Sequence, residues 1–235
     1  MGASSGLGRE VALALLKKGW RVGVAARRRE PLEELKKDFP LQVEVAEIDV
    51  VENCASTELL ALVKRLGGMD LYFHSSGVGK QNPMLEEDVE LSTVETNATG
   101  FTRMVGAAFR YMAAHGGGQI AVISSIAGTR GLGPAPSYSA TKALQGNYIE
   151  ALEQLSQNRQ LGITFTDIRP GFVDTMLLKD THYPMLMRPD RVARAIVKAI
   201  ERHRHVVIID WRYCLLVIFW RLVPRWLWRH FPLVR

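Results

Sequence analysis

The first ten residues, MGASSGLGRE (1–10), decide the fold class. Gly2, Gly6 and Gly8 form a G-x-x-x-G-x-G pattern just ahead of apolar residues at helical spacing. Glycines in such a turn let the backbone approach a pyrophosphate closely, and the N-terminus of the following helix favours its negative charge. The same letters also fit a flexible, small-residue N-terminus, so the pattern needs support from the rest of the chain.

The chain after this turn alternates between strands and helices. The alternation predicts a parallel sheet covered on both faces, and right-handed crossovers make it a doubly wound, Rossmann-type α/β fold. A glycine turn of this kind normally follows a strand. We therefore expect about six further residues of strand upstream of Met1 and a truncated sequence. Strands are predicted over 20–27, 41–50, 69–77, 117–125, 162–171 and 205–210. Helices are predicted from the end of the glycine turn to about Gly19 and over 31–39, 56–68, 86–114, 138–158 and 189–202.

The composition is that of an ordinary globular protein. A hydrophobic content of 47% supplies a core, and the net charge of +6 fits nucleic acid, anionic lipid or a phosphorylated ligand. Cys54 and Cys214 lack metal-ligand spacing, so no metal site is expected. One disulfide between them is conceivable, but we expect two unpaired thiols in a reducing, cytoplasmic compartment. No secretory signal is visible in the sequence. We expect one dinucleotide-binding and catalytic domain over 1–210, followed by a helical segment over 211–235.

The end of the second expected strand indicates which dinucleotide suits the glycine turn. An acidic residue at this point would hold the ribose 2′-hydroxyl of NAD, whereas a cation suits the 2′-phosphate of NADP. The sequence has Ala26 followed by three arginines, of which Arg27 is the best placed and Arg28 the second. A solvated basic helix start is the alternative, although cations oppose the dipole at a helix N-terminus. NADP(H) is therefore favoured over NAD(H), with Asp49 placed to meet the adenine.

A tyrosine and a lysine four residues apart form the candidate proton-transfer pair. Tyr138 and Lys142 in YSATK (138–142) share one face of a helix. A neighbouring ammonium group favours the phenolate and lowers the pKa of the phenol toward the range that proton transfer requires. Ser125 follows a buried strand and has a hydroxyl that could polarise a carbonyl. Alone, a Y-x-x-x-K match proves little.

Six motifs in a fixed order resemble the short-chain dehydrogenase/reductase family over nearly the whole chain. The resemblance implies a homodimer or homotetramer that interconverts a carbonyl and a secondary alcohol by hydride transfer with a nicotinamide cofactor. The small-molecule substrate itself stays open. The motifs are GASSGLG (2–8), DV (49–50), NATG (97–100), SS (124–125), YSATK (138–142) and RPG (169–171).

The resemblance also implies a role for each residue of the catalytic set. Tyr138 is the general acid in reduction and the base in oxidation, and Lys142 binds the nicotinamide ribose and lowers the tyrosine pKa. Ser125, rather than Ser124, holds the substrate oxygen. Asn97 interrupts its helix and holds a water of the proton relay.

The same resemblance implies a larger set of cofactor contacts. Each position has a structural alternative: Asn97 as a helix-surface amide, Ser125 and Tyr138 as polar ends of a strand and a helix, and Thr175 as a helix cap. The implied contacts are Gly2, Ser4, Ser5, Gly6, Leu7, Gly8, Arg27, Arg28, Asp49, Val50, Ser76, Gly77, Tyr138, Lys142, Pro170, Gly171, Val173 and Thr175.

One motif departs from the family pattern. The usual NNAG appears as His74-Ser75-Ser76-Gly77. Gly77 keeps the turn near the cofactor, but Ser75 replaces the asparagine that commonly steadies the central strands. We expect His74 to be a structural strand residue.

Two readings of the function and of the substrate remain. A non-catalytic NADP(H)-binding sensor or scaffold is the alternative to an enzyme, although such a protein would not need the complete catalytic set. The segment DTMLLKDTHYPMLM (174–187) is rich in Met and Leu. It indicates an apolar substrate, although core packing explains the same residues.

The C-terminal segment WRYCLLVIFWRLVPRWLWRHFPLVR (211–235) is the least family-like part. It carries five arginines, no acidic residue and four of the five tryptophans. Aromatic rings mixed with arginine suit peripheral contact with a membrane surface. Packing against the domain, over the substrate site or in an oligomer interface, is the alternative, and nucleic acid is not expected. Its longest apolar stretch, 213–220, is far shorter than the ~20 residues of a spanning helix. Pro224 is expected to divide the segment into two short helices.

Overall fold

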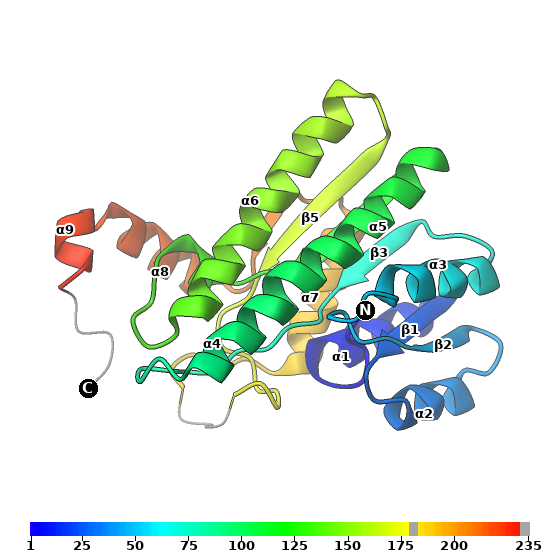
Figure 1. The fold of residues 1–235 in the computed structure, drawn as a ribbon, viewed down its shortest axis with the longest axis horizontal. Coiled ribbons are helices and arrows are strands. Elements are labelled where there is room, and N and C mark those ends of the chain that lie inside the picture. The colour runs from blue at the N-terminus through cyan, green and yellow to red at the C-terminus, as the bar shows by residue number, and fades with distance from the viewer. Residues whose placement is uncertain (179–182, 231–235) are drawn as a thin grey trace.

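The computed structural model describes residues 1–178 and 183–230. Its strands pair in parallel in two groups, β1 with β2 and then β3-β4-β5-β6 (Figure 1). All six predicted strands are present, and the Rossmann-type α/β fold is confirmed. Their bounds are β1 (Val22–Ala26), β2 (Val43–Glu47), β3 (Leu71–His74), β4 (Gly118–Ile123), β5 (Ile163–Arg169) and β6 (Val206–Ile208).

The backbone of the first residues lies between the two groups of strands. The amino group of Met1 donates to the Phe73 carbonyl at 2.9 Å, and the Ser75 N–H donates to the Met1 carbonyl at 3.0 Å. On the other side, the Gly2 N–H donates to the Ala25 carbonyl at 2.7 Å. Residues 1–2 thus stand between β1 and β3, where the glycine turn begins. The expected strand upstream of Met1 stays a prediction.

Helices cover both faces of the sheet. On one face α1 packs against α7, and on the other α3 packs against α5 and α4 against α6; Figure 1 shows α5 and α6 running alongside β5. This two-sided cover is what makes the fold doubly wound. The bounds are α1 (Gly6–Leu16), α2 (Glu30–Asp38), α3 (Ala55–Leu66), α4 (Glu87–Val94), α5 (Phe101–Ala114), α6 (Pro136–Asn158) and α7 (Pro189–Glu201).

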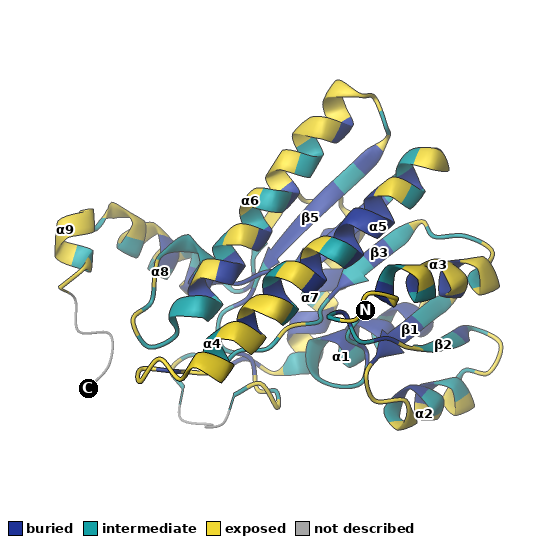
Figure 2. Ribbon diagram, viewed as in Figure 1, coloured by how far each residue is buried: buried dark blue, intermediate teal, exposed yellow. Residues whose placement is uncertain are grey.

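The core alternates between the two faces along the central strand β4. Ile120 and Val122 join the apolar cluster under α3 and α5, whereas Ala121 joins the cluster under α1 and α7. Successive side chains of a strand point to opposite faces, so both faces of β4 are buried. This is why the strand is a continuous apolar run in the sequence. Figure 2 shows the neighbouring strand β5 largely buried beside α6, whose outer side is exposed.

The helix predicted over 86–114 is interrupted in the middle. A π-helical turn, Glu95–Gly100, separates α4 from α5, and Asn97 lies inside it. The expectation that Asn97 interrupts its helix is therefore confirmed. A π turn shifts the helical pattern by a single residue, so the sequence still has the periodicity of one long helix.

The C-terminal segment forms α8 (Trp211–Leu222) and α9 (Arg225–Trp228), divided at Pro224 as predicted. Tyr213 and Val217 of α8 are buried against the domain, so one face of the segment packs as the second expectation proposed. Among the residues that the structure describes, no helix is long and apolar enough to cross a membrane. Cys54 and Cys214 are unpaired, as expected.

Candidate active site

Three elements bring the four candidate catalytic residues together. Ser125 follows β4, Tyr138 and Lys142 lie in the first two turns of α6, and Asn97 lies in the π-helical turn. Pro136 at the start of α6 carries no backbone N–H, so it begins this helix without leaving a donor unsatisfied. The sequence pattern placed α6 two residues later, at Tyr138.

The phenol of Tyr138 lies beside Ser125 and beneath the turn after β3. A hydrogen bond with Ser125 lowers the pKa of Tyr138, but burial raises it by more, so the net shift is upward. A Cβ atom on Gly79 would lie 2.8 Å from the Tyr138 ring, so glycine is needed there. The Ser125 hydroxyl also accepts from the Ala127 N–H at 3.1 Å, which fixes its oxygen.

Lys142 is a buried cation held by two acceptors. Its ammonium group donates to the Ile123 carbonyl and to the Gln145 side-chain oxygen, both at 2.9 Å. Burial lowers the pKa of Lys142 to about 8, and the charge of Asp167 partly opposes that shift. The ammonium group lies 5.8 Å from the centre of the Tyr138 ring. The lowering of the tyrosine pKa by Lys142 stays a prediction.

Asn97 is fully buried and ties the turn after β3 to α6. Its side-chain oxygen accepts from the Val78 N–H at 2.8 Å, and its amide donates to the Val78 carbonyl at 2.7 Å and to the Thr141 hydroxyl at 3.3 Å. These bonds, with 0% exposure, exclude the alternative of a helix-surface amide. The relay water expected at Asn97 stays a prediction.

Gln145 is a site residue that the sequence analysis missed. It is fully buried, and its amide donates to the Asn97 main-chain carbonyl at 2.9 Å while its oxygen accepts from Lys142. The side chain therefore connects Asn97 to Lys142 directly. It lies one helical turn after Lys142, so the i, i+3 spacing was visible, but no motif marks a glutamine there.

A second missed group lies behind Lys142. Asp167 in β5 is buried, its carboxylate accepts from the Ser124 hydroxyl, and it forms an ion pair with Arg169 at 2.7 Å. Ser124 is thus engaged with Asp167, consistent with the choice of Ser125 over Ser124 for the substrate. A buried carboxylate near a buried ammonium favours the charged form of the ammonium.

The glycine turn has the bare backbone that a pyrophosphate needs. A Cβ atom would lie 2.7 Å from the Ser76 nitrogen if placed on Gly2 and 2.0 Å from the Gly2 carbonyl oxygen if placed on Gly8. Gly2 and Gly6 also adopt positive φ, +86° and +54°, which favours glycine. The first turn of α1 has no acidic residue and no side-chain cap, so its N–H groups suit an anion. These residues fit a dinucleotide.

Arg28 reaches over this turn, and Arg27 does not contact it. The Arg28 guanidinium donates to the hydroxyls of Ser5 at 3.2 Å and Ser4 at 3.4 Å. Arg27 is exposed, and Arg29 pairs with Glu33 at 3.0 Å. The structure therefore places the second-ranked arginine, rather than the first, beside the glycine turn.

The remaining cofactor candidates on the β1–β3 side lie along the same edge. Asp49 accepts from the Val51 N–H at 3.2 Å, and Val50 is buried against Gly100. Gly77 faces Asn97 and Lys142, because a Cβ atom there would lie 3.2 Å from the Asn97 oxygen and 3.7 Å from the Lys142 nitrogen. Adenine contact by Asp49 stays a prediction.

The segment after β5 closes the other side. A Cβ atom on Gly171 would lie 2.2 Å from the Tyr213 ring. Helix α8, in the C-terminal tail (211–235), therefore packs directly on this turn. The Thr175 methyl group faces Gly6, since a Cβ atom there would lie 3.5 Å from it. Val173 is buried and pairs with Met187 through an isolated bridge. No helix begins near Thr175 among the described residues, so it is not a helix cap.

His74 is a structural residue of β3, as expected. It is fully buried, lies 2.9 Å from the Tyr72 hydroxyl through Nδ1, and packs edge-on against Phe101. Burial lowers the pKa of His74 to about 3, so the ring is neutral at pH 7. Ser75, which replaces the family asparagine, faces Gly8 of the turn. Within the described ranges, no group of three or more His, Cys, Asp or Glu residues has metal-site geometry.

Comparison with known proteins identifies the family. The family model described as short chain dehydrogenase matches residues 1–184. An uncharacterised oxidoreductase of Myxococcus xanthus is 34% identical over 90% of this chain and 86% of its own length. An uncharacterised oxidoreductase of Mycobacterium tuberculosis is 30% identical over 95% and 92%.

A solved structure shares the fold. The crystal structure of a short-chain dehydrogenase from Streptomyces avermitilis covers 94% of this chain and 91% of its own chain, with a TM-score of 0.81 and 23% sequence identity. The family match over residues 1–184 and the relatives at 34% and 30% identity agree with it. The chain therefore belongs to the short-chain dehydrogenase family, a family of oxidoreductases that use a nicotinamide cofactor.

Proposed function

We propose that the protein is an NADP(H)-dependent oxidoreductase that interconverts a carbonyl and a secondary alcohol. One observation carries the proposal: Asn97, Ser125, and Tyr138 with Lys142 come from three separate elements and meet at the end of the sheet where the glycine turn lies. Polar groups that served only as strand and helix ends would not need to converge. In this fold, ligands bind beyond the carboxyl ends of the strands.

The residues of the chain position the substrate and manage its proton. Ser125 holds the substrate oxygen, and Tyr138 gives a proton to that oxygen in reduction and takes it back in oxidation. Lys142 holds the ribose and, as a cation, stabilises the phenolate that Tyr138 becomes. The bound nicotinamide supplies the hydride. Gln145 keeps the ammonium group of Lys142 in place from the side of Asn97.

The position of Arg28 supports the preference for NADP(H). Its guanidinium lies over the serines of the glycine turn, at the end of β1, and no acidic residue precedes Glu30 there. A guanidinium binds a phosphate through paired, charge-assisted hydrogen bonds. An acidic side chain is better suited than a guanidinium to hold the 2′-hydroxyl of NAD(H). The turn backbone, Asp49 and Val50, and the segment Pro170–Thr175 complete the proposed site.

The chemistry is tested by Tyr138→Phe. The variant should lose on the order of a hundredfold to ten-thousandfold in kcat for a carbonyl found by screening aldehydes and ketones, because the proton donor is gone. NADPH binding, followed by nucleotide fluorescence, should persist. Unchanged turnover would contradict the mechanism. A wild-type chain that binds NADPH but reduces no carbonyl in the screen would support the sensor or scaffold instead.

We further propose a homodimer or homotetramer in the cytoplasm, with peripheral membrane contact through 211–235. The support is the family for the oligomer and the exposed arginines and tryptophans of the tail for the contact. Analytical ultracentrifugation tests the oligomeric state.

A further inference from the structure

Helix α8 carries a second apolar face that points away from the domain. At about 100° per residue, its exposed large apolar side chains fall within an arc of about 100° on the side opposite Tyr213 and Val217. Helix α9 adds Trp226, which is 67% exposed. The stripe on α8 consists of Trp211 (70% exposed), Leu215 (56%), Ile218 (57%), Phe219 (66%) and Leu222 (77%).

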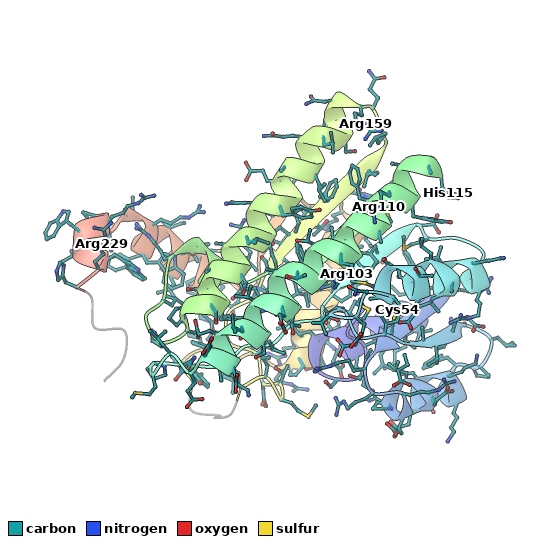
Figure 3. All side chains as sticks on the ribbon, in the orientation of Figure 1. Cys54, Arg103, Arg110, His115, Arg159 and Arg229 are labelled. Atoms are coloured by element: carbon teal, nitrogen blue, oxygen red, sulfur yellow. The ribbon has the colours of Figure 1, made fainter. Side chains whose placement is uncertain are left out.

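Arginines border this stripe. Arg212 and Arg221 lie on its two flanks, and Arg225 and Arg229 follow on α9, all of them exposed; Figure 3 shows Arg229 at the outer end of the tail. Asp210, just before α8, pairs with Arg212 at 2.7 Å. Residues 211–235 contain no acidic residue. An apolar stripe with aromatic rings and a cationic border matches the interface of an anionic bilayer.

The same border disfavours a second copy of the chain as the occupant. A two-fold interface places the same patch on both subunits, so the arginines of one tail would meet those of the other. Like charges brought together cost free energy, and no carboxylate within the tail would neutralise them. A lipid surface with negative headgroups has the complementary charge.

The tail is fastened to the loop that joins Ser125 to Tyr138. The Trp220 indole donates to the Thr129 hydroxyl at 2.9 Å, and the Trp228 indole donates to the Gly131 carbonyl at 2.9 Å. The Arg130 guanidinium donates to the carbonyls of Arg221 and Val223 at 2.8 and 2.7 Å. The helices that carry the stripe therefore also hold a wall of the proposed substrate site.

The tail holds the opposite wall as well. The Tyr213 hydroxyl accepts from the Phe172 N–H at 3.0 Å and lies 3.2 Å from the carbonyls of Pro184 and Met185. Phe172 follows Gly171, which borders the proposed nicotinamide position. Both loops that flank the site are thus attached to α8 and α9.

Exposed apolar side chains continue around the same end of the molecule. Met84 and Leu85 are 82% and 61% exposed, and the Asn82 N–H donates to the Pro134 carbonyl at 2.8 Å, which brings their loop beside the one held by the tail. Met176 and Leu177, after Thr175, are 71% and 46% exposed. Figure 1 shows these loops at the end of the fold from which α8 and α9 extend. Grouped exposed apolar side chains of this size indicate a membrane or ligand contact.

We propose that α8 and α9 lie on an anionic membrane surface and that the site takes a lipid-soluble carbonyl or alcohol from the bilayer. The substrate class rests on the proposed oxidoreductase function, whereas the docking does not. Docking would place the stripe in the headgroup region and the site, held by the same helices, at the lipid boundary.

Docking is tested by co-sedimentation of the full chain with vesicles of phosphatidylcholine, with and without phosphatidylglycerol. The wild type should sediment with the anionic vesicles. Changing Arg221, Arg225 and Arg229 together to Gln should weaken partitioning on the order of a hundredfold, about fivefold for each charge. The double variant Ile218→Glu/Leu222→Glu should abolish sedimentation. Its matched control, Leu41→Glu/Leu60→Glu, changes exposed leucines on α3 and before β2 and should sediment like the wild type.

The substrate class is tested with NADPH, a short-chain methyl ketone in water and its long-chain homologue carried in the vesicles. Anionic vesicles should raise wild-type turnover of the long-chain ketone severalfold over that of Ile218→Glu/Leu222→Glu, and the two proteins should have equal midpoints of thermal unfolding. Equal rates on the long-chain ketone would overturn the bilayer source.

The remaining outcomes separate the docking from the chemistry. A wild type that does not sediment with anionic vesicles overturns the docking. Loss of a dimer in Ile218→Glu/Leu222→Glu also overturns it, because the stripe would then be an interface between copies. Sedimentation without NADPH oxidation on any ketone would contradict the proposed function and leave the docking supported.

Discussion

Arg28 gives the cofactor preference a test at the scale of one residue. Arg28→Ala should weaken NADPH binding roughly tenfold to a hundredfold, the value of a lost hydrogen bond to a charged group, and leave NADH binding nearly unchanged. Isothermal titration with both nucleotides measures the two constants. Arg29→Ala, which removes a guanidinium paired with Glu33, is the control and should change neither. If Arg27→Ala has the larger effect, Arg27 rather than Arg28 holds the phosphate.

Gln145 can be tested through the pH profile. Burial lowers the pKa of Lys142 to about 8, so kcat/KM for NADPH should fall as the pH rises through that value and Lys142 loses its proton. Gln145→Glu adds an anion beside the ammonium group and should move this limb upward by about one pH unit. Gln145→Leu removes an acceptor of the charged form and should move it downward.

A purely structural role for Gln145 would give a different result. Both variants would then lose activity without moving the limb in opposite directions. Gln154→Leu, on the exposed face of the same helix, is the matched control and should leave the profile unchanged.

Some site residues could be predicted from the sequence and others could not. Tyr138 and Lys142 were predictable because four residues on a helix share a face. Gln145 was not, because its importance comes from Asn97, 48 positions away, which only the packing of α6 against the π-helical turn brings within 2.9 Å. Asp167 likewise looked like one polar residue in a buried strand.

At the scale of elements, the contact between α8 and the turn after β5 can be measured. Tyr213→Phe removes the acceptor of the Phe172 N–H and should destabilise the fold by about 1–3 kcal/mol, the cost of an unsatisfied buried donor. Urea unfolding gives the difference. Tyr111→Phe, on α5 away from the tail, should cost less. An unchanged unfolding midpoint for Tyr213→Phe would show that α8 is not held by this bond.

The elements themselves were predictable where local chemistry determines them. β1 and β3 were short apolar stretches followed by polar residues, β2 alternated between apolar and acidic residues, and Pro224 divided the tail because proline cannot donate within a helix. The π-helical turn was invisible to periodicity, and only the family resemblance indicated an interruption at Asn97. The two faces of α8 look alike in sequence, since both are apolar, so which one packs on the domain depends on the tertiary structure.

At the scale of the whole molecule, the two groups of strands are connected by backbone hydrogen bonds at the start of the glycine turn. Within the part of the chain that the structure describes, β1 and β2 pair with each other, whereas β4 and β5 lie inside a four-stranded sheet. Residues 1–2 lie between β1 and β3, with backbone hydrogen bonds to Phe73 and Ser75 on one side and to Ala25 on the other. The backbone amides of β1 and β2 should therefore exchange with solvent through opening reactions of lower free energy than those of β4 and β5.

Bound NADPH should reverse much of this difference, because its proposed contacts lie on both groups: the turn and Arg28 beside β1, and Gly77, Lys142 and Gly171 beside β3–β5. A ligand that binds only when both groups of strands are in place stabilises that arrangement by about 2.7 kcal/mol at a hundredfold excess over its Kd. Hydrogen–deuterium exchange with and without NADPH should therefore show the larger protection in Val22–Ala26 and Val43–Glu47. Arg28→Ala, at the same NADPH concentration, should lose most of that protection. Protection confined to β4 and β5 would instead mean that the nucleotide does not span the turn, and the proposed site would have to lie elsewhere.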